Sequence, residues 1–321
     1  MSIQVEDYFA RDTFNKMKAF ADKQETPFVL IDTAMISKAY DDLRAGFEFA
    51  KVYYAVKANP AVEIIDLLKE KGSSFDIASI YELDKVLGRG VSADRISYGN
   101  TIKKSKDIRY FYEKGVRLYA TDSEADLRNI AKAAPGSKVY VRILTEGSTT
   151  ADWPLSRKFG CQTDMAMDLL ILARDLGLVP YGISFHVGSQ QRDISVWDAA
   201  IAKVKVIFER LKEEDGIVLK LINMGGGFPA NYITRTNSLE TYAEEIIRFL
   251  KEDFGDALPE IILEPGRSLK ANAGILVSEV VLVARKSRTA VERWVYTDVG
   301  KFSGLIETMD DAIKFPIRPA E

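Results

Sequence analysis

The feature that most constrains the fold is a regular alternation of short apolar, β-branched runs with amphipathic stretches, from about residue 50 to about residue 268. Helical patterns such as AVEIIDLLKEKG and EADLRNIAKAA separate the apolar runs. Eight such strand-helix repeats predict an α/β fold of the (β/α)8, TIM-type barrel class. The eight candidate strands are VYYAVKA, SFDIAS, RISYGN, RLYATDS, VYVRIL, GISFHVGS, LKLINMGGG and EIILEPGR.

The pattern changes after Arg267. GILVSEVVLVARKS and AVERWVYTDVG are β-rich runs without an intervening helix, which predicts a separate C-terminal sheet. The first residues contain one predicted helix, TFNKMKAFADKQ, which we expect to pack on that sheet. The expected organisation is therefore an N-terminal segment at 1–27, a barrel at 28–268 and a partial β-sheet domain at 269–321.

Composition narrows the kind of partner. The net charge of −3 has both signs interspersed and no basic run, so neither nucleic acid nor a membrane surface is an expected partner, and a small molecule is favoured. The acidic opening segment and the lack of an apolar stretch of spanning length predict a cytoplasmic location. A single cysteine, Cys161, and a single histidine, His186, leave no Cys/His metal site, and no metal is expected.

Reactive residues gather at the ends of the predicted strands, where the loops of such barrels form the catalytic face. Polar strand ends are common simply because strands emerge into solvent, but a polar, charged or glycine element at six of the eight ends favours a site. These elements are Lys57, Asp76, Arg142, His186, Gly225 to Gly227, and Glu264.

Lys57 follows an apolar run and precedes Ala-Asn-Pro, so its amine is expected to be partly desolvated at the barrel mouth and therefore nucleophilic. Reaction with an aldehyde to form a Schiff base is the natural use of such an amine. A solvated lysine at the start of a helix is the structural alternative, and the other strand ends favour the reactive interpretation.

Two glycine-containing motifs predict an anion site. GGGFP places three glycines where a strand turns toward a helix, which lets backbone N–H groups approach an anion, although a plain tight turn has the same pattern. EPGR combines Glu264, Pro265, Gly266 and Arg267, and together with Ser189 it forms a candidate phosphate cup. The long polar connection TEGSTTADWPLSRKFG is expected to be a functional loop over this site.

The motifs YAVKANP, FDIAS, KFG, FHVGS, GGGFP and EPGR, in this order, resemble the alanine-racemase-like (fold-type III) pyridoxal-phosphate decarboxylases, and most of all the bacterial ornithine/lysine decarboxylases. The resemblance implies pyridoxal 5'-phosphate as cofactor, bound covalently by Lys57. It assigns catalytic roles to Lys57, His186 and Glu264, with His186 stacked on the ring and Glu264 paired with the ring nitrogen. The implied cofactor-binding set is Lys57, Asp76, Arg142, His186, Ser189, Gly226, Gly227, Glu264, Pro265, Gly266 and Arg267.

The resemblance implies decarboxylation of a basic amino acid, with ornithine converted to putrescine for polyamine biosynthesis. Lysine or diaminopimelate decarboxylation, or a cofactor-binding regulatory homologue without turnover, are the alternatives. Racemases of this fold carry an arginine opposite the ring nitrogen, so Glu264 disfavours racemisation. Asp310 aligns loosely with a substrate-amine ligand, and His186 as a plain core imidazole remains open.

The resemblance also implies a homodimer with shared sites, in which Lys158 of KFG bridges to the partner subunit. Family members continue beyond the position of Glu321 through a Cys-Asp motif and a tyrosine-containing segment that enter the neighbouring site. Cys161 lies beside KFG and does not replace that cysteine. We therefore expect the chain as given to bind cofactor but to decarboxylate poorly.

Overall fold

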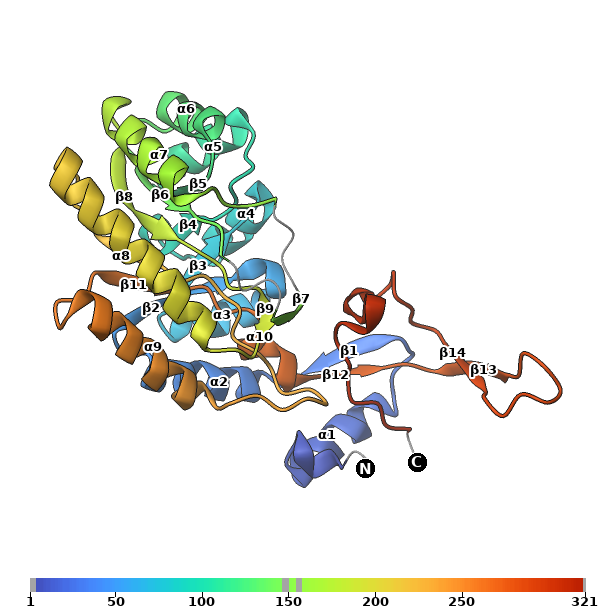
Figure 1. Ribbon diagram of the computed structural model, residues 1–321. Helices are drawn as coiled ribbons and strands as arrows, with labels where there is room; N and C mark the ends of the chain where they lie inside the picture. The colour runs from blue at the N-terminus through green and yellow to red at the C-terminus, as the bar shows by residue number, and fades with distance from the viewer. Residues whose placement is uncertain (1–3, 146–149, 154–157, 320–321) are drawn as a thin grey trace.

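The computed structural model describes residues 4–145, 150–153 and 158–319. Its main body is a closed barrel of eight parallel strands in the order β10-β11-β2-β3-β4-β5-β6-β8, which confirms the predicted α/β barrel (Figure 1). Every one of the eight predicted strands contributes to it. They are β2 (Ala50–Ala55), β3 (Ser74–Ile77), β4 (Ile96–Tyr98), β5 (Leu118–Thr121), β6 (Lys138–Arg142), β8 (Val179–Ser184), β10 (Leu221–Asn223) and β11 (Glu260–Leu263).

Helices cover the outside of the barrel because each buries one apolar face against the strands. Their ends follow the sequence: Asp32 caps the first of them by accepting a hydrogen bond from the Ala34 N–H at 2.8 Å, and the longest ends at Gly216, whose φ is +67°. The covering helices are α2 (Thr33–Gly46), α3 (Val62–Glu70), α4 (Ile80–Gly88), α5 (Ser105–Glu113), α6 (Glu124–Ala133), α7 (Thr163–Asp175), α8 (Ser195–Asp215), α9 (Leu239–Phe254) and the short α10 (Arg267–Lys270).

Inside the barrel, bulky apolar side chains fill the middle layer and polar side chains lie at the carboxyl ends of the strands. Because successive strand residues point to opposite sides, Phe75 and Ile77 of β3 join the large core under the helices. The interior cluster contains Tyr53, Ala120, Tyr140, Leu221 and Ile262. The barrel is therefore packed below its mouth, the end formed by the carboxyl ends of the strands, which is where barrels of this class bind their ligands.

The remaining strands lie outside the barrel. β1 (Phe28–Ile31) pairs antiparallel with β12 (Gly274–Val277), although the sequence boundary at residue 28 had placed it with the barrel. This pairing joins segments about 245 residues apart, which a local pattern does not reveal. α1 (Arg11–Ala21) lies beside this pair, and the hairpin β13 (Val280–Ala284) and β14 (Trp294–Thr297) extends away from the barrel (Figure 1).

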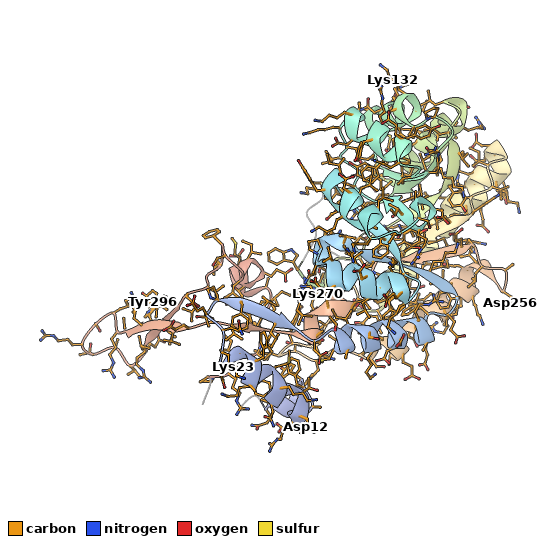
Figure 2. The ribbon with its side chains drawn as sticks, turned by 180° about the vertical axis from the view of Figure 1, so that it is seen from behind. Asp12, Lys23, Lys132, Asp256, Lys270 and Tyr296 are labelled. Atoms are coloured by element: carbon orange, nitrogen blue, oxygen red, sulfur yellow. The ribbon has the colours of Figure 1, made fainter. Side chains whose placement is uncertain are left out.

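The hairpin β13–β14 exposes apolar side chains. Val281 and Val295 are 60% and 58% exposed, and Figure 2 shows Tyr296 on the hairpin at a distance from the barrel. A lone two-stranded hairpin is marginally stable, and an exposed apolar surface of this kind usually packs against another element. The observed strands agree with the expected partial β-sheet domain in type, and its boundaries stay a prediction.

The long connection after β6 returns to the barrel mouth. Within it, β7 (Ala151–Trp153) pairs antiparallel with β9 (Ser189–Gln191), and Arg192 forms an ion pair with Asp152. Residues 146–149 and 154–157 of the same connection lie outside the described residues. The described part of the predicted loop is thus held by backbone pairing and one ion pair to the segment that follows His186.

A buried ion pair stabilises the top of the barrel between β4 and β5. Lys103 Nζ lies 2.7 Å from Asp126 Oδ2, and the two side chains are 0% and 8% exposed. Lys103 also donates to the backbone oxygens of Asn100 and Ala120, and Thr121 donates to Asp126. The pair therefore ties the β4–α5 loop to the end of β5.

Replacing Lys103 with methionine should lower the free energy of unfolding by about 3–5 kcal/mol, because the buried carboxylate of Asp126 loses its counterion. Urea denaturation measures this change. The matched control is Lys38→Met, which removes the exposed Lys38–Asp42 pair and should leave stability nearly unchanged. Equal losses from the two substitutions would contradict this account of the Lys103–Asp126 pair.

Among the described residues, no helix combines the length and apolar character needed to cross a membrane.

Candidate functional site

Lys57 lies in η2 (Val56–Ala58), the single turn that follows β2. This turn is attached to the EPGR loop, because the Ala55 N–H donates to the Pro265 oxygen at 3.1 Å. A Cβ added at Gly266 would lie 2.8 Å from Cβ of Ala58, so only glycine allows the two loops to pack this closely. The lysine and the EPGR motif therefore lie at the same mouth of the barrel.

The side chain of Lys57 is exposed, which differs from the partial desolvation expected from the sequence. The turn η2 carries the residue beyond the last paired residue of β2, and this displacement places its side chain above the packed layer. Within the described part of the chain, no hydrogen bond or ion pair engages its amine. The amine is consequently accessible to a molecule that enters the mouth.

Glu264 follows β11 and is fixed by Asn223 at the end of β10. The Asn223 amide donates to Glu264 Oε1 at 2.5 Å, and its own oxygen accepts a hydrogen bond from the Gly225 N–H at 2.9 Å. The Glu264 N–H in turn donates to the Gly225 oxygen at 2.7 Å. Sequence reasoning missed Asn223, although a polar residue at the end of the apolar run LKLIN was a usable signal. These contacts hold one carboxylate oxygen of Glu264 in a set direction.

Asp76 lies at the inner surface of β3 and is 6% exposed. Ser97 Oγ donates to its Oδ1 at 3.2 Å, and a Cβ at Gly99 would lie only 1.9 Å from the same oxygen. Burial, and then the negative charge of Glu264, raises the pKa of Asp76 to about 8, against the opposing charge of Lys57. Asp76 is therefore mostly protonated at neutral pH.

This pKa predicts a pH effect on stability when no ligand is bound. Below a pH of about 4 the Asp76 carboxyl is protonated in both the folded and the unfolded protein. Between pH about 4 and about 8 the unfolded protein releases this proton while the folded protein keeps it. The free energy of unfolding therefore falls as the pH rises through this range. Asp76→Asn removes this dependence. We expect the variant to gain on the order of 4 kcal/mol relative to the parent between pH 5 and pH 8 in urea denaturation. If the variant instead became more stable relative to the parent as the pH fell, the pKa of Asp76 in the folded protein would not be raised.

His186 is neutral and held in one orientation. Its pKa lies well below the usual range because of burial first, and then the positive charges of Arg142 and Lys57. The Gly188 N–H donates to His186 Nδ1 at 3.1 Å, which assigns the ring proton to Nε2. Burial likewise lowers the pKa of Arg142, while the carboxylates of Glu264 and Asp122 act in the opposite direction.

The triple-glycine turn lies between the His186 and Glu264 loops. A Cβ at Gly226 would lie 2.6 Å from the backbone oxygen of Glu264. A Cβ at Gly227, whose φ is +102°, would lie 2.6 Å from the backbone oxygen of Gly188. Both positions therefore require glycine. Among the described residues, nothing accepts a hydrogen bond from the N–H groups of Gly226 and Gly227. Two free backbone donors at one turn are typical of an anion site.

Arg267 is the most fully engaged side chain of the site. Its Nε and Nη2 donate to Ser189 Oγ at 3.1 and 2.9 Å, and its Nη1 donates to the Tyr232 hydroxyl at 3.1 Å. Nη1 and Nη2 also form a bidentate salt bridge with Glu307, donating to its Oε2 at 2.8 Å and its Oε1 at 2.6 Å. Burial alone would lower the pKa of Arg267, but Glu307 and Tyr232 raise it above its ordinary value. All five guanidinium N–H donors are therefore in use.

Three further residues considered in the sequence analysis are Asp310, Lys158 and Cys161. Asp310 is exposed, with a φ of +53°, in the same short helix, η6 (Ile306–Asp311), that carries Glu307. Lys158 contacts the ring of its neighbour Phe159 and is exposed. Burial, and then Asp122, raises the pKa of the Cys161 thiol to about 12, so this cysteine is unreactive as a nucleophile.

The site combines an accessible amine, a fixed carboxylate, a flat neutral imidazole and an anion cup with free donors. These groups suit an aromatic aldehyde that carries a phosphate: the amine can bind the aldehyde carbon, and the cup can bind the phosphate. Nothing in the described ranges 4–145, 150–153 and 158–319 groups three or more His, Cys, Asp or Glu residues as a metal site. The residues present therefore fit pyridoxal phosphate, as the sequence implies.

Comparison with known proteins agrees with this chemistry. Residues 33–271 match the family model described as pyridoxal-dependent decarboxylase, pyridoxal binding domain. The chain is 33% identical to ornithine decarboxylase of Saccharomyces cerevisiae over 288 residues, which cover 88% of this chain and 59% of the yeast protein. It is 32% identical to lysine/ornithine decarboxylase of Selenomonas ruminantium over 303 residues, covering 94% of this chain and 75% of that protein.

A solved structure gives the same result. The lysine/ornithine decarboxylase of Vibrio vulnificus complexed with putrescine has a TM-score of 0.85 and 26% identity, over 96% of this chain and 81% of that one. The chain spans 59% of the yeast enzyme's length, and the family match covers the pyridoxal binding domain.

Proposed function

Since this chain belongs to the pyridoxal-dependent decarboxylases, we propose that its protein decarboxylates a basic amino acid, ornithine in preference to lysine, with pyridoxal 5'-phosphate bound through Lys57. The observation that carries the proposal is the hydrogen bond between Ala55 and Pro265, since it joins the turn of Lys57 to the loop of Glu264 at one barrel mouth. The names of the relatives support the substrate class: ornithine in yeast, and lysine or ornithine in Selenomonas.

Each chemical task of the proposed reaction can be assigned to one residue of the site. Lys57 Nζ would bind the aldehyde carbon, and it is the accessible amine of the mouth. Glu264, directed by Asn223, would hold a proton on the ring nitrogen. Neutral His186 would pack on the ring face without repelling the neighbouring cations. When bound, pyridoxal phosphate supplies an electron-poor ring that accepts the electrons left as carbon dioxide departs.

The phosphate would be held at the glycine turn. Gly226 and Gly227 supply free N–H donors, Gly266 lies at the adjacent loop, and Ser189 supplies a hydroxyl. Asp76, protonated at neutral pH, would add a neutral acid beside Lys57 instead of a second negative charge. These residues together would orient the cofactor before any substrate binds.

The substrate and assembly belong to the proposal as well. We place Asp310 near the distal amine of the substrate, since η6 also carries Glu307 at the anion cup. A homodimer with shared sites, bridged by Lys158, is the assembly we propose, and sedimentation of the purified protein tests it. The single free cysteine suits a reducing compartment, and we propose the cytoplasm.

The direct test is release of carbon dioxide from carboxyl-labelled amino acids by the full-length protein with added cofactor. Ornithine should be the best substrate, lysine second and diaminopimelate third. Bound cofactor with no release from any of the three would instead favour a regulatory cofactor carrier. Loss of optical rotation without gas would indicate a racemase.

A further inference from the structure

The hydroxyl of Tyr140 is buried inside the barrel. Tyr140 lies in β6 and packs with Tyr53, Leu221 and Ile262 in the interior cluster, where it is 1% exposed. In the part of the chain that the structure describes, its enclosed hydroxyl oxygen has no partner at hydrogen-bonding distance and angle. An unbonded buried hydroxyl destabilises a protein, and an ordered water molecule is a common partner for such a group.

The groups around this hydroxyl are polar. After burial, the carboxyl groups of Glu264 and then Asp76 raise the pKa of Tyr140 well above its usual range, while the nearby Ser97 hydroxyl acts in the opposite direction. The phenol therefore keeps its hydrogen at neutral pH and is able to donate it. Ser97 Oγ in turn donates to Asp76 Oδ1 at 3.2 Å. Polar groups from several strands around an unbonded donor are what a buried water molecule requires.

The register of the strands places Tyr140 below the mouth. It is paired with Ala120 of β5 and with Gly182 of β8, so the neighbouring strands carry a small residue on each side of it. Arg142 lies two residues further along β6, on the same side of the strand and nearer the mouth. A molecule bound at the Tyr140 hydroxyl is therefore enclosed by the barrel and lies apart from the phosphate cup.

We propose that one ordered water molecule is bound inside the barrel by the Tyr140 hydroxyl, and that it donates hydrogen bonds to the carboxyl groups of Asp76 and Glu264. Buried water molecules make about three hydrogen bonds, which matches one accepted from Tyr140 and one donated to each carboxyl. Tyr140 is then a positioning residue, because it sets the direction in which the water donates. The inference needs neither substrate nor turnover, so it can fail while the proposed function holds.

The expected consequence is a change in the proton affinity of Asp76. A hydrogen bond donated to a carboxyl favours its ionised form, so loss of the water should raise the pKa of Asp76 above its value of about 8. Tyr140→Phe removes the hydroxyl and keeps the ring, and we expect it to raise this pKa by about one pH unit. The charged and polar side chains that face Asp76 from the other elements are Glu264, Lys57, Ser97, Glu82 and Arg142, and the substitution leaves all of them in place.

A crystal structure of the full-length parent protein tests the water directly. We expect electron density for a water molecule about 2.6–3.2 Å from Tyr140 Oη and from a carboxyl oxygen of Asp76. The same density should be lost in Tyr140→Phe. A parent structure without this water, or a water that persists in Tyr140→Phe, would overturn the inference. The first of these results comes from the parent alone, so it does not depend on the folding of the variant.

Carbon-13 NMR of labelled aspartate carboxyl groups measures the pKa. The signal of Asp76 is assigned by its loss in Asp76→Asn and is titrated in the parent, in Tyr140→Phe and in Tyr53→Phe. Tyr53 is the matched control, because it belongs to the same interior cluster while its hydroxyl is influenced by Glu260 and Ser74. Tyr53→Phe should leave the pKa of Asp76 as in the parent. An unchanged or lowered pKa in Tyr140→Phe, or an equal rise in both variants, would contradict the proposed role of Tyr140.

Discussion

Replacing Lys57 with alanine should abolish the visible absorbance of the lysine-bound cofactor and lower decarboxylation by at least about a thousandfold, because it removes the amine that we propose as the covalent anchor of the cofactor. The loss should appear in kcat even at saturating cofactor. Absorbance spectra and initial rates of carbon dioxide release measure the two effects.

The matched control for this prediction is Lys51→Ala. Lys51 lies near the start of the same strand, β2, and pairs with Glu260 at 2.9 Å, at the end of the barrel away from the mouth. It should keep both the absorbance and the rate. A Lys57→Ala protein that retained the visible band would require a different anchoring lysine.

Replacing Glu264 with glutamine should lower kcat by about 100-fold to 1,000-fold while leaving cofactor bound, because a neutral amide cannot hold the ring nitrogen in its protonated form. The shape of the side chain is retained, so the effect isolates the charge. Measured at saturating substrate and cofactor, the loss should fall on kcat more than on KM.

Glu260→Gln is the control for Glu264→Gln. Glu260 begins β11, the strand that Glu264 follows, and faces Lys51 and Tyr181 at the opposite end of the barrel. Its substitution should leave kcat unchanged. An equally active Glu264→Gln enzyme would remove the carboxylate from the mechanism.

The barrel was predictable from sequence because its signals are local. Each strand reads as a short apolar run and each helix as a 3.6-residue pattern, and Lys57, His186 and Glu264 stand at strand ends where those runs stop. Closure of the barrel then brings these ends to one mouth, so residues from separate strands could be assigned to one site before any coordinates.

The parts that sequence did not predict depend on contacts between distant residues or on exact placement. The pairing of Phe28–Ile31 with Gly274–Val277 needs a partner from the other end of the chain. The salt bridge between Glu307 and Arg267 was not predicted either, because no recognised sequence motif includes Glu307 and the contact is visible only in the folded chain. The exposure of Lys57 follows from one turn beyond β2, a displacement smaller than pattern reasoning can resolve.

The identity of the cofactor-bearing lysine can be measured in one experiment. Borohydride treatment of the protein loaded with pyridoxal phosphate reduces the carbon-nitrogen bond between cofactor and lysine to a stable amine, and mass spectrometry of the digested protein locates it. The label should be found on the peptide that contains Lys57. A label confined to any other lysine, or no label on a protein that binds the cofactor, would contradict the structure of the site described above.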